Sequence, residues 1–304
     1  MPDVSHHQCT QAAQPVKLPQ GLDAVAHSVA GVLGSRASLR ALRTEAMRIR
    51  SQAEEFRDLR DSVVAERMIT LREVFRRRGS NAKAGESEAL ALTVEAARRK
   101  TGLEAHLEQI MGALAIHRQA LVEMATGEGK TLTIALAAVS LGWSRRPTHI
   151  ITANDYLAAR DAKNLNKFYE FCGVSVAHVT GGMVLEERQA SYKASVVYTT
   201  AKEVAADFLR DRLTLGVLAD SGRLIIRQLL QRRGSPADRI VQRGLHTAIV
   251  DEADHAMIDE AVTPLNISRQ VPNDSLIEAA RTAHQLVAGL EERKHYKIDA
   301  LHKE

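Results

Sequence analysis

The sequence predicts an α/β fold, in which a parallel β-sheet is covered by helices on both faces and is preceded by a helical segment. From residue 120 onward, short apolar runs alternate with longer stretches of helical periodicity, which is the pattern of a parallel sheet. One apolar run leads into the glycine-rich loop at 125–131, and another ends in two acids at 251–252. Ligands on such sheets bind beyond the carboxyl ends of the strands, so we expect the functional site at the ends of these two runs.

The N-terminal region predicts helices. Residues 1–35 mix His, Gln, Pro and Gly, and we expect poor order there. From Leu39 apolar residues recur at intervals of three and four, which predicts an amphipathic helix. The spacing slips near Leu59 and resumes as far as Phe75, and three arginines followed by Gly79 form a favourable helix end. The next residues predict a loop at 81–86 and helices at 87–100 and 103–117.

The alternating region then predicts the sheet. Strands are expected at 120–124, 149–153, 174–179, 195–199 and 247–250. The helices between them are expected at 130–143, 156–171 and 183–193, with a fourth ending at 208.

Two segments fall outside this alternation. Residues 212–239 are interpreted as an insertion, with a helical piece at 224–233 followed by a Gly-Ser-Pro loop signal. After Pro272, helical spacing returns at 276–290, and residues 295–299 could begin a strand.

The stretch Gln119–Thr131, QALVEMATGEGKT, has the composition of a phosphate-binding loop. Successive backbone N–H groups of such a loop face a phosphate, and the helix N-terminus behind it adds partial positive charge. Lys130 would reach the outer phosphates, and the Thr131 hydroxyl would ligate Mg²⁺. Met124 stands where the strict pattern has its first glycine. A glycine turn that merely contains a lysine is the alternative interpretation of this stretch by itself.

A second stretch, TAIVDEAD at 247–254, supplies the acids of such a site. In P-loop NTPases an acid at a strand end holds the Mg²⁺ shell, and a following Glu orients the attacking water. Asp251 fits the first role and Glu252 the second. A polar loop after a buried strand is the alternative, but it does not explain the GEGKT loop at the end of another strand. Together the two stretches predict a P-loop NTPase that binds ATP or ADP with Mg²⁺ and acts by positioning and electrostatics.

Composition limits the setting of this site. The 304 residues are 45% hydrophobic and 26% charged, as in a globular protein of one or two domains. The net charge is +4, and residues 36–100 hold sixteen Lys or Arg against ten Asp or Glu. This excess suits anionic lipid headgroups or nucleic acid, although a solvated helical face explains it as well.

The same composition favours a cytoplasmic protein. A peripheral position on the inner face of the cell membrane is the alternative location. The first residues have no apolar core, so they are not expected to be a signal peptide. The longest apolar run, Leu132–Trp143, is too short to span a bilayer. Cys9 and Cys172 show no pairing pattern, which fits a reducing compartment.

Several motifs resemble SecA, the motor ATPase of bacterial protein export. EMATGEGKTL resembles the phosphate loop of that family, which also has Met in place of the first glycine. TANDYLAARDA at 152–162 and the segment 241–268 resemble two further motifs, and TTAKEVAADFLRD at 199–211 is a weaker match. The resemblance extends from about residue 30 to the end. It implies a RecA-like domain of the helicase superfamily 2 type.

The resemblance also implies roles for individual residues. Residues 102–112 resemble the stretch with an adenine-reading glutamine, which falls on Gln109. Asp251 would complete the metal shell and Glu252 would be the catalytic base, with Lys130 acting on the transferred phosphate. The phosphates and Mg²⁺ would be held by Gly127, Glu128, Gly129, Lys130 and Thr131.

This sequence departs from the family in several places. His106 lies where an aromatic ring is expected near the adenine, and Val262 replaces an Arg. Residues 36–268 correspond to the first nucleotide-binding domain, and 269–304 to the opening of a preprotein-clamping domain. In the family, a second RecA-like half contributes arginines that complete the ATP site, and here that half would be a separate partner. The resemblance implies unfolded preprotein and a membrane protein-conducting channel as further partners.

Two other functions are left open by the sequence. Asp251–Asp254 spell the DEAD motif of nucleic-acid helicases, and the N-terminal region is basic. Against a helicase, TANDYLAARDA does not resemble the strand-contacting motif of RNA helicases, and aromatics for base stacking are only 4% of the chain. The other alternative is a nucleotide-binding regulator without motor function.

Overall fold

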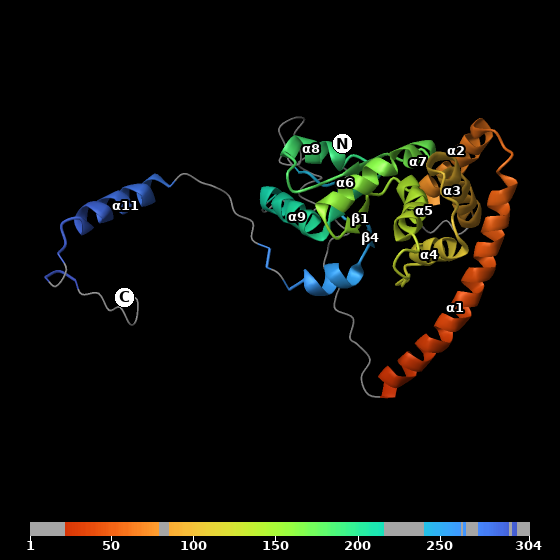
Figure 1. Cartoon of the computed structure of the whole chain (residues 1–304), viewed down its shortest axis with the longest axis horizontal. Helices are drawn as coiled ribbons and strands as arrows, with labels where there is room; N and C mark the ends of the chain where they lie inside the picture. Colours follow the sequence, from red (N-terminus) through yellow and green to blue (C-terminus); the bar gives the residue numbers. More distant parts are fainter. Residues whose placement is uncertain are drawn as a thin grey trace. The chain divides into compact units, whose positions relative to one another are not determined.

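The computed structural model describes residues 22–78, 85–215, 240–262, 264–265, 273–291 and 294–296, with the side chains of the first helix described from Leu39. The chain forms two compact units, Met1–Leu265 and Asn266–Glu304. The helices of the first unit are α1 (Leu22–Glu55), α2 (Asp61–Arg78), α3 (Glu86–Thr101), α4 (Leu107–His117), α5 (Lys130–Trp143), α6 (Asp155–Asn164), α7 (Asn166–Phe171), α8 (Leu185–Ser191) and α9 (Ala201–Leu215), all shown in Figure 1.

A parallel sheet forms the centre of this unit. Its strands are β1 (Thr148–Thr152), β2 (Val176–His178), β3 (Val196–Thr200) and β4 (Thr247–Val250), in the order β2-β3-β1-β4. In the register of the sheet, Ile150 of β1 lies between Tyr198 of β3 and Ile249 of β4. Every residue of β1 and β3 is buried, so the chain covers both faces of these two strands.

Alternation along the strands divides the core into two clusters. Ile150 and Tyr198 point into the main hydrophobic cluster with the N-terminal helices. Val197 points to the opposite face and packs in a smaller cluster with Val179 and Tyr192. The N-terminal helices therefore share one continuous core with the sheet.

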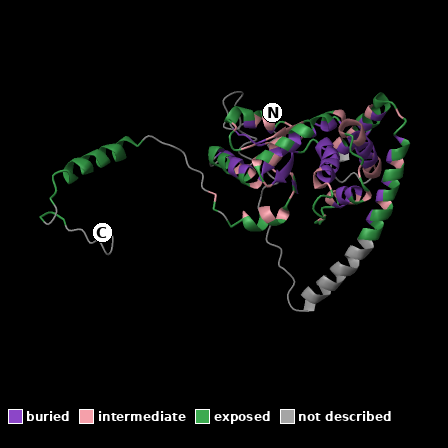
Figure 2. Ribbon diagram, viewed as in Figure 1, coloured by how far each residue is buried: buried purple, intermediate pink, exposed green. Residues whose placement is uncertain are grey.

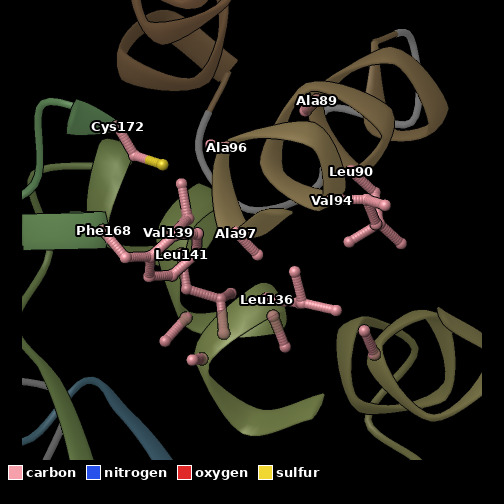
Figure 3. Close-up of a cluster of buried hydrophobic side chains, with 14 of the residues drawn as sticks. Ala89, Leu90, Val94, Ala96, Ala97, Leu136, Val139, Leu141, Phe168 and Cys172 are labelled. Atoms are coloured by element: carbon pink, nitrogen blue, oxygen red, sulfur yellow. The ribbon is translucent and has the colours of Figure 1, made fainter. Parts of the chain in front are cut away.

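Helix α5 is the most buried helix of the main cluster, because it is apolar on all sides. Every residue from Leu132 to Trp143 is buried. Figure 3 shows the small side chains Ala96 and Ala97 of α3 in the same cluster as Leu136 and Val139 of α5. The Trp143 indole is also satisfied, since its Nε1 donates to the Cys172 carbonyl at 2.8 Å.

The corner between α1 and α2 explains the slip in apolar spacing near Leu59. Arg99 of α3 donates to the carbonyl oxygens of Phe56 at 2.7 Å and Leu59 at 2.8 Å. The same guanidinium pairs with buried Glu95 at 2.6 Å and with Asp61 at 2.6 Å. The carbonyls that the end of α1 leaves without helical partners are thereby satisfied.

Most predicted elements are confirmed, with shifted ends. Helix α1 begins at Leu22, within the tail predicted at 1–35, and residues 1–21 of that tail lie outside the described residues. Helix α4 begins at Leu107, not at 103. The single helix predicted at 156–171 is two helices that meet at Leu165, and α9 continues to Leu215. The rest of the predicted insertion, with its helical piece at 224–233, lies outside the described residues.

The strand predicted at 120–124 is wrong. The structure assigns these residues to neither a helix nor a strand, and they belong to no sheet. The Leu121 side chain is 91% exposed. A strand is stable only when a neighbour satisfies its backbone, and no described strand pairs with this stretch.

The second unit contains α11 (Asp274–Val287), close to the predicted 276–290. Its N-terminus is capped by Asn273, whose Oδ1 accepts from the Leu276 N–H at 3.1 Å. Figure 2 shows this helix exposed along its length. The strand predicted from residue 295 falls largely outside the described residues, at 297–299.

Candidate nucleotide site

A hollow of about 1630 Å³ brings the two predicted halves of the site together. Lys130, at the start of α5, lines one side of the hollow. Asp251 and Glu252, directly after β4, line another. The three residues therefore lie around one hollow, as expected, although the stretch before the glycine loop is not a strand of the sheet.

The glycine loop needs its glycines for conformation. Gly127 has φ of 90° and Gly129 has φ of 76°, both in the left-handed region that residues with a Cβ rarely adopt. Gly129 is also the N-cap of α5. The loop therefore leads its chain directly into the N-terminus of a long helix, where an anion is stabilised by free N–H groups and by the helix dipole.

Gln109 lies against this loop. Its side chain is 6% exposed, and its Nε2 donates to the Glu128 carbonyl at 2.8 Å. Its Oε1 accepts from the His106 N–H at 2.9 Å, which caps α4. The amide thus joins the start of α4 to the phosphate loop. Its predicted contact with adenine stays a prediction, since both ends of the amide are already bonded within the chain.

Close packing behind the loop depends on Gly112 of α4. A Cβ at this position would lie 2.7 Å from Thr133 Cγ2 and 3.3 Å from Met124 Sδ. Only glycine lets α4 approach α5 and residue 124 this closely. Gly112 belongs to the 102–112 motif, but its role in packing could not be predicted from the motif.

The acids after β4 have distinct environments. Asp251 continues the sheet, because its N–H donates to the Ile151 carbonyl at 2.8 Å. Burial raises the pKa of its carboxyl, and the neighbouring Glu252 charge raises it further, while the Lys130 charge lowers it. A cation beside this carboxylate would favour its charged form.

Glu252 has an unusual backbone. Its φ of 52° places a non-glycine residue in the left-handed region, a conformation that costs about 1–3 kcal/mol and concentrates at functional sites. Its N–H donates to its neighbour Asp251 Oδ1 at 3.1 Å, and the side chain is exposed. The chain then enters a π-helix, His255–Asp259.

The predicted Mg²⁺ ligands have suitable chemistry. The Thr131 hydroxyl and the Asp251 carboxylate are hard oxygen donors, which Mg²⁺ prefers. Among the described residues no cluster of three or more His, Cys, Asp or Glu could hold a metal by itself. Mg²⁺ sites in general use one or two protein ligands, completed by water and substrate phosphates.

Asp161 is a further acidic residue near the site, and the sequence motifs did not predict a role for it. It lies in α6, within TANDYLAARDA, and is 7% exposed. Its charge also raises the pKa of Asp251. The Arg160 Nε donates to Asp161 Oδ1 at 2.7 Å and so compensates this buried carboxylate.

Comparison with known proteins gives consistent matches. The family model described as the SecA DEAD-like domain matches residues 30–304. The protein translocase subunit SecA 2 of Chlorobium chlorochromatii is 45% identical over 293 residues, which cover 96% of this chain and 44% of that protein. SecA 2 of Magnetococcus marinus is 41% identical over 94% of this chain and 44% of its own length. SecA of Crocosphaera subtropica is 34% identical over 81% of this chain and 25% of its own length.

The chain thus spans less than half the length of these relatives. Within the described residues, no helix combines the length and the apolar character needed to cross a bilayer.

Proposed function

The chain belongs to the SecA DEAD-like domain family, and from this premise we propose that it is the ATP-binding motor domain of a protein translocase. In this proposal ATP hydrolysis is coupled to the export of unfolded preprotein through a membrane channel. The names of the relatives, protein translocase subunits, support this assignment. The proposed setting is the cytoplasm or the inner face of the cell membrane, where the basic N-terminal helices would meet anionic lipid.

The predicted site residues, of which Lys130, Asp251 and Glu252 line the hollow, receive roles in this function. Gly127, Glu128 and Gly129 would present backbone N–H groups to the phosphates, and Lys130 would neutralise the outer phosphate charge. Thr131 and Asp251 would hold Mg²⁺, which when bound stabilises charge on the transferred phosphate. Glu252 would orient the attacking water. The list is completed by Gln109, which would contact adenine.

One observation supports the proposal most strongly. Lys130 and the pair Asp251–Glu252 come from stretches about 120 residues apart, yet they line the same hollow. The charges of Lys130 and Asp251 are close enough to affect the pKa of the Asp251 carboxyl. A glycine turn with no function would not require this convergence.

The direct test is the ATP affinity of the Lys130→Ala variant. A charged hydrogen bond is worth about 1.5–3 kcal/mol, so we expect affinity to fall by about 10- to 100-fold. Lys163→Ala, at an exposed position of α6, is the matched control and should bind ATP normally. Equal affinity of the two variants, measured by calorimetry, would show that the loop does not bind phosphate.

Turnover by this chain alone should be slow. In this proposal a second RecA-like half supplies an arginine to the site, and such an arginine is worth about 10³-fold or more in rate. Rapid steady-state hydrolysis by the isolated chain would contradict this part of the proposal.

A DEAD-type helicase is the second candidate, because Asp251–Asp254 spell that motif. Once the second RecA-like half is present, the ligand that stimulates ATP hydrolysis distinguishes the two functions. A translocase is stimulated by unfolded preprotein with channel-containing vesicles, whereas a helicase is stimulated by RNA.

A further inference from the structure

Helix α9 has an exposed apolar stripe. Ala205, Leu209 and Leu213 recur at intervals of four, so they lie on one face of the helix. All three are exposed, and Leu213 is 72% exposed, whereas Asp207 and Asp211 on the opposite side are buried. Single exposed leucines are common on protein surfaces. A row of apolar residues along one helix face, here called the outer stripe, is instead typical of a face that binds another helix.

Residues 216–239, which lie outside the described residues, begin and end beside this helix. They follow directly after Leu215, the last residue of α9. Just after them, the N–H groups of Val241 and Gln242 donate to the two oxygens of the Asp211 carboxylate at 2.8 and 2.9 Å. Both ends of the segment are therefore held on the last two turns of α9.

The returning end is fixed by side chains as well. The Gln242 Nε2 donates to the Val204 carbonyl of α9 at 2.8 Å. The Arg243 Nε donates to the Tyr192 carbonyl at 2.7 Å. Gln242 and Asp211 are each only 1% exposed, so these bonds are shielded from water. The base of the segment is therefore a fixed part of the first unit.

The sequence of the segment supplies an apolar helix face. Residues 224–233, RLIIRQLLQRR with the preceding arginine, have helical spacing. On a helix with 3.6 residues per turn, four apolar residues fall on one face, namely Ile225, Ile226, Leu229 and Leu230. The opposite face carries Arg227, Gln228, Gln231 and Arg232.

We propose that residues 224–233 form a helix that packs its apolar face on the outer stripe, antiparallel to α9. The dimensions agree, because the stripe from Ala205 to Leu213 is about 12 Å long and ten helical residues span about 15 Å. Residues 216–223 reach at most about 28 Å, which is enough for the chain to reverse direction after Leu215. The arginines of the segment would then face solvent.

The segment of the same chain is favoured over other occupants by its attachment. Because both of its ends are held on α9, its effective concentration at the stripe is of millimolar order. A second copy of the chain at micromolar concentration competes poorly with it. An anionic membrane is the other competitor, since a basic amphipathic helix also suits lipid headgroups. The proposal is independent of nucleotide and of the proposed function.

Thiol accessibility tests the proposal on the whole chain. Ala205→Cys is made in a Cys9→Ser background, where the remaining Cys172 is buried and should not react. With Ellman's reagent, the new thiol should react about tenfold more slowly than that of Ala41→Cys, an equally conservative change at an exposed site of α1. Equal rates of the two thiols overturn the proposal.

Substitutions within the segment give matched controls at the same thiol. Ile226→Asp places a charge on the predicted apolar face and should raise the reaction rate of Ala205→Cys about tenfold. Gln228→Asp adds the same charge to the polar face and should leave the thiol protected. Neither residue belongs to the described core, so both chains should fold. Equal rates in the two variants overturn the proposal.

Dilution and added lipid identify the competing occupants. Protection by a segment of the same chain should not change with protein concentration or with vesicles of phosphatidylglycerol. Protection that is lost on dilution would assign the stripe to a second copy and overturn the proposal. Loss of protection on addition of the vesicles, with the chain then bound to them, would assign the segment to the membrane and overturn it too.

Discussion

Replacing Gly129 by alanine should disrupt the phosphate loop through two separate contacts. The backbone at Gly129 has φ of 76°, and a left-handed conformation costs about 1–2 kcal/mol for a residue with a Cβ. The new methyl group would lie 2.3 Å from Gln109 Nε2. The amide must therefore move, which breaks its hydrogen bonds to Glu128 and His106. At about 1 kcal/mol each, these bonds bring the total to about 3–4 kcal/mol.

Urea unfolding measures this loss, and a double-mutant cycle locates it. Gln109→Ala removes the atom that the new Cβ would strike, so the effect of Gly129→Ala in that background should fall to about 1–2 kcal/mol. Gly182→Ala is the control, because a Cβ there would have no neighbour within 4 Å. Strictly additive effects, or equal stability of Gly129→Ala and Gly182→Ala, would refute the proposed contact between Gln109 and the loop.

Two further predictions concern stability. Burial lowers the pKa of His149 to about 4, so the folded state binds fewer protons than the unfolded state between that pH and the ordinary value near 6.5. Its contribution to the free energy of unfolding is therefore complete above about pH 6.5 and is lost as the pH falls to 4, by about 3 kcal/mol. The fall in urea midpoint from pH 7 to pH 4.5 should be larger in the unmodified chain than in the His149→Gln variant, and an equal fall in both would contradict this prediction. Arg99→Ala should destabilise the α1–α2 corner by about 3 kcal/mol, because it removes hydrogen bonds worth about 1 kcal/mol each to the Phe56 and Leu59 carbonyls and to Glu95, while Arg98 still pairs with Glu95. The exposed Arg43→Ala should cost less than about 0.5 kcal/mol, and equal thermal midpoints of the two variants would exclude the role of this corner.

The sequence predicted the sheet well where strands pair with a neighbouring strand of the chain. β1, β3 and β4 are short apolar runs, and their predicted positions match within one residue. The prediction of a strand at 120–124 was wrong, because residue propensities do not report whether a neighbouring strand is present. Its residues suit a strand, but a strand also needs a neighbour, and the described residues supply none. The break at Leu165 was missed because the apolar spacing continues through both helices.

In the site, too, features set by local sequence could be predicted, whereas features set by tertiary packing could not. The positions of Lys130, Asp251 and Glu252 follow from where their strands and loops end, so their convergence could be predicted. The bond from Gln109 to the Glu128 carbonyl could not, because it depends on how the start of α4 packs beside the loop. The left-handed backbone at Glu252 is likewise set by the surrounding structure, since glutamate by itself does not favour it.

The effect of Mg²⁺ on ATP affinity tests the central claim most directly. If Lys130, Thr131 and Asp251 form one site, the unmodified chain should bind ATP more tightly with Mg²⁺ than with a chelator. Asp251→Asn should lose this difference while it keeps the affinity measured in chelator, because the loop and Lys130 remain. No ATP binding by the unmodified chain, or an unchanged Mg²⁺ effect in Asp251→Asn, would contradict the claim that these residues form a nucleotide site.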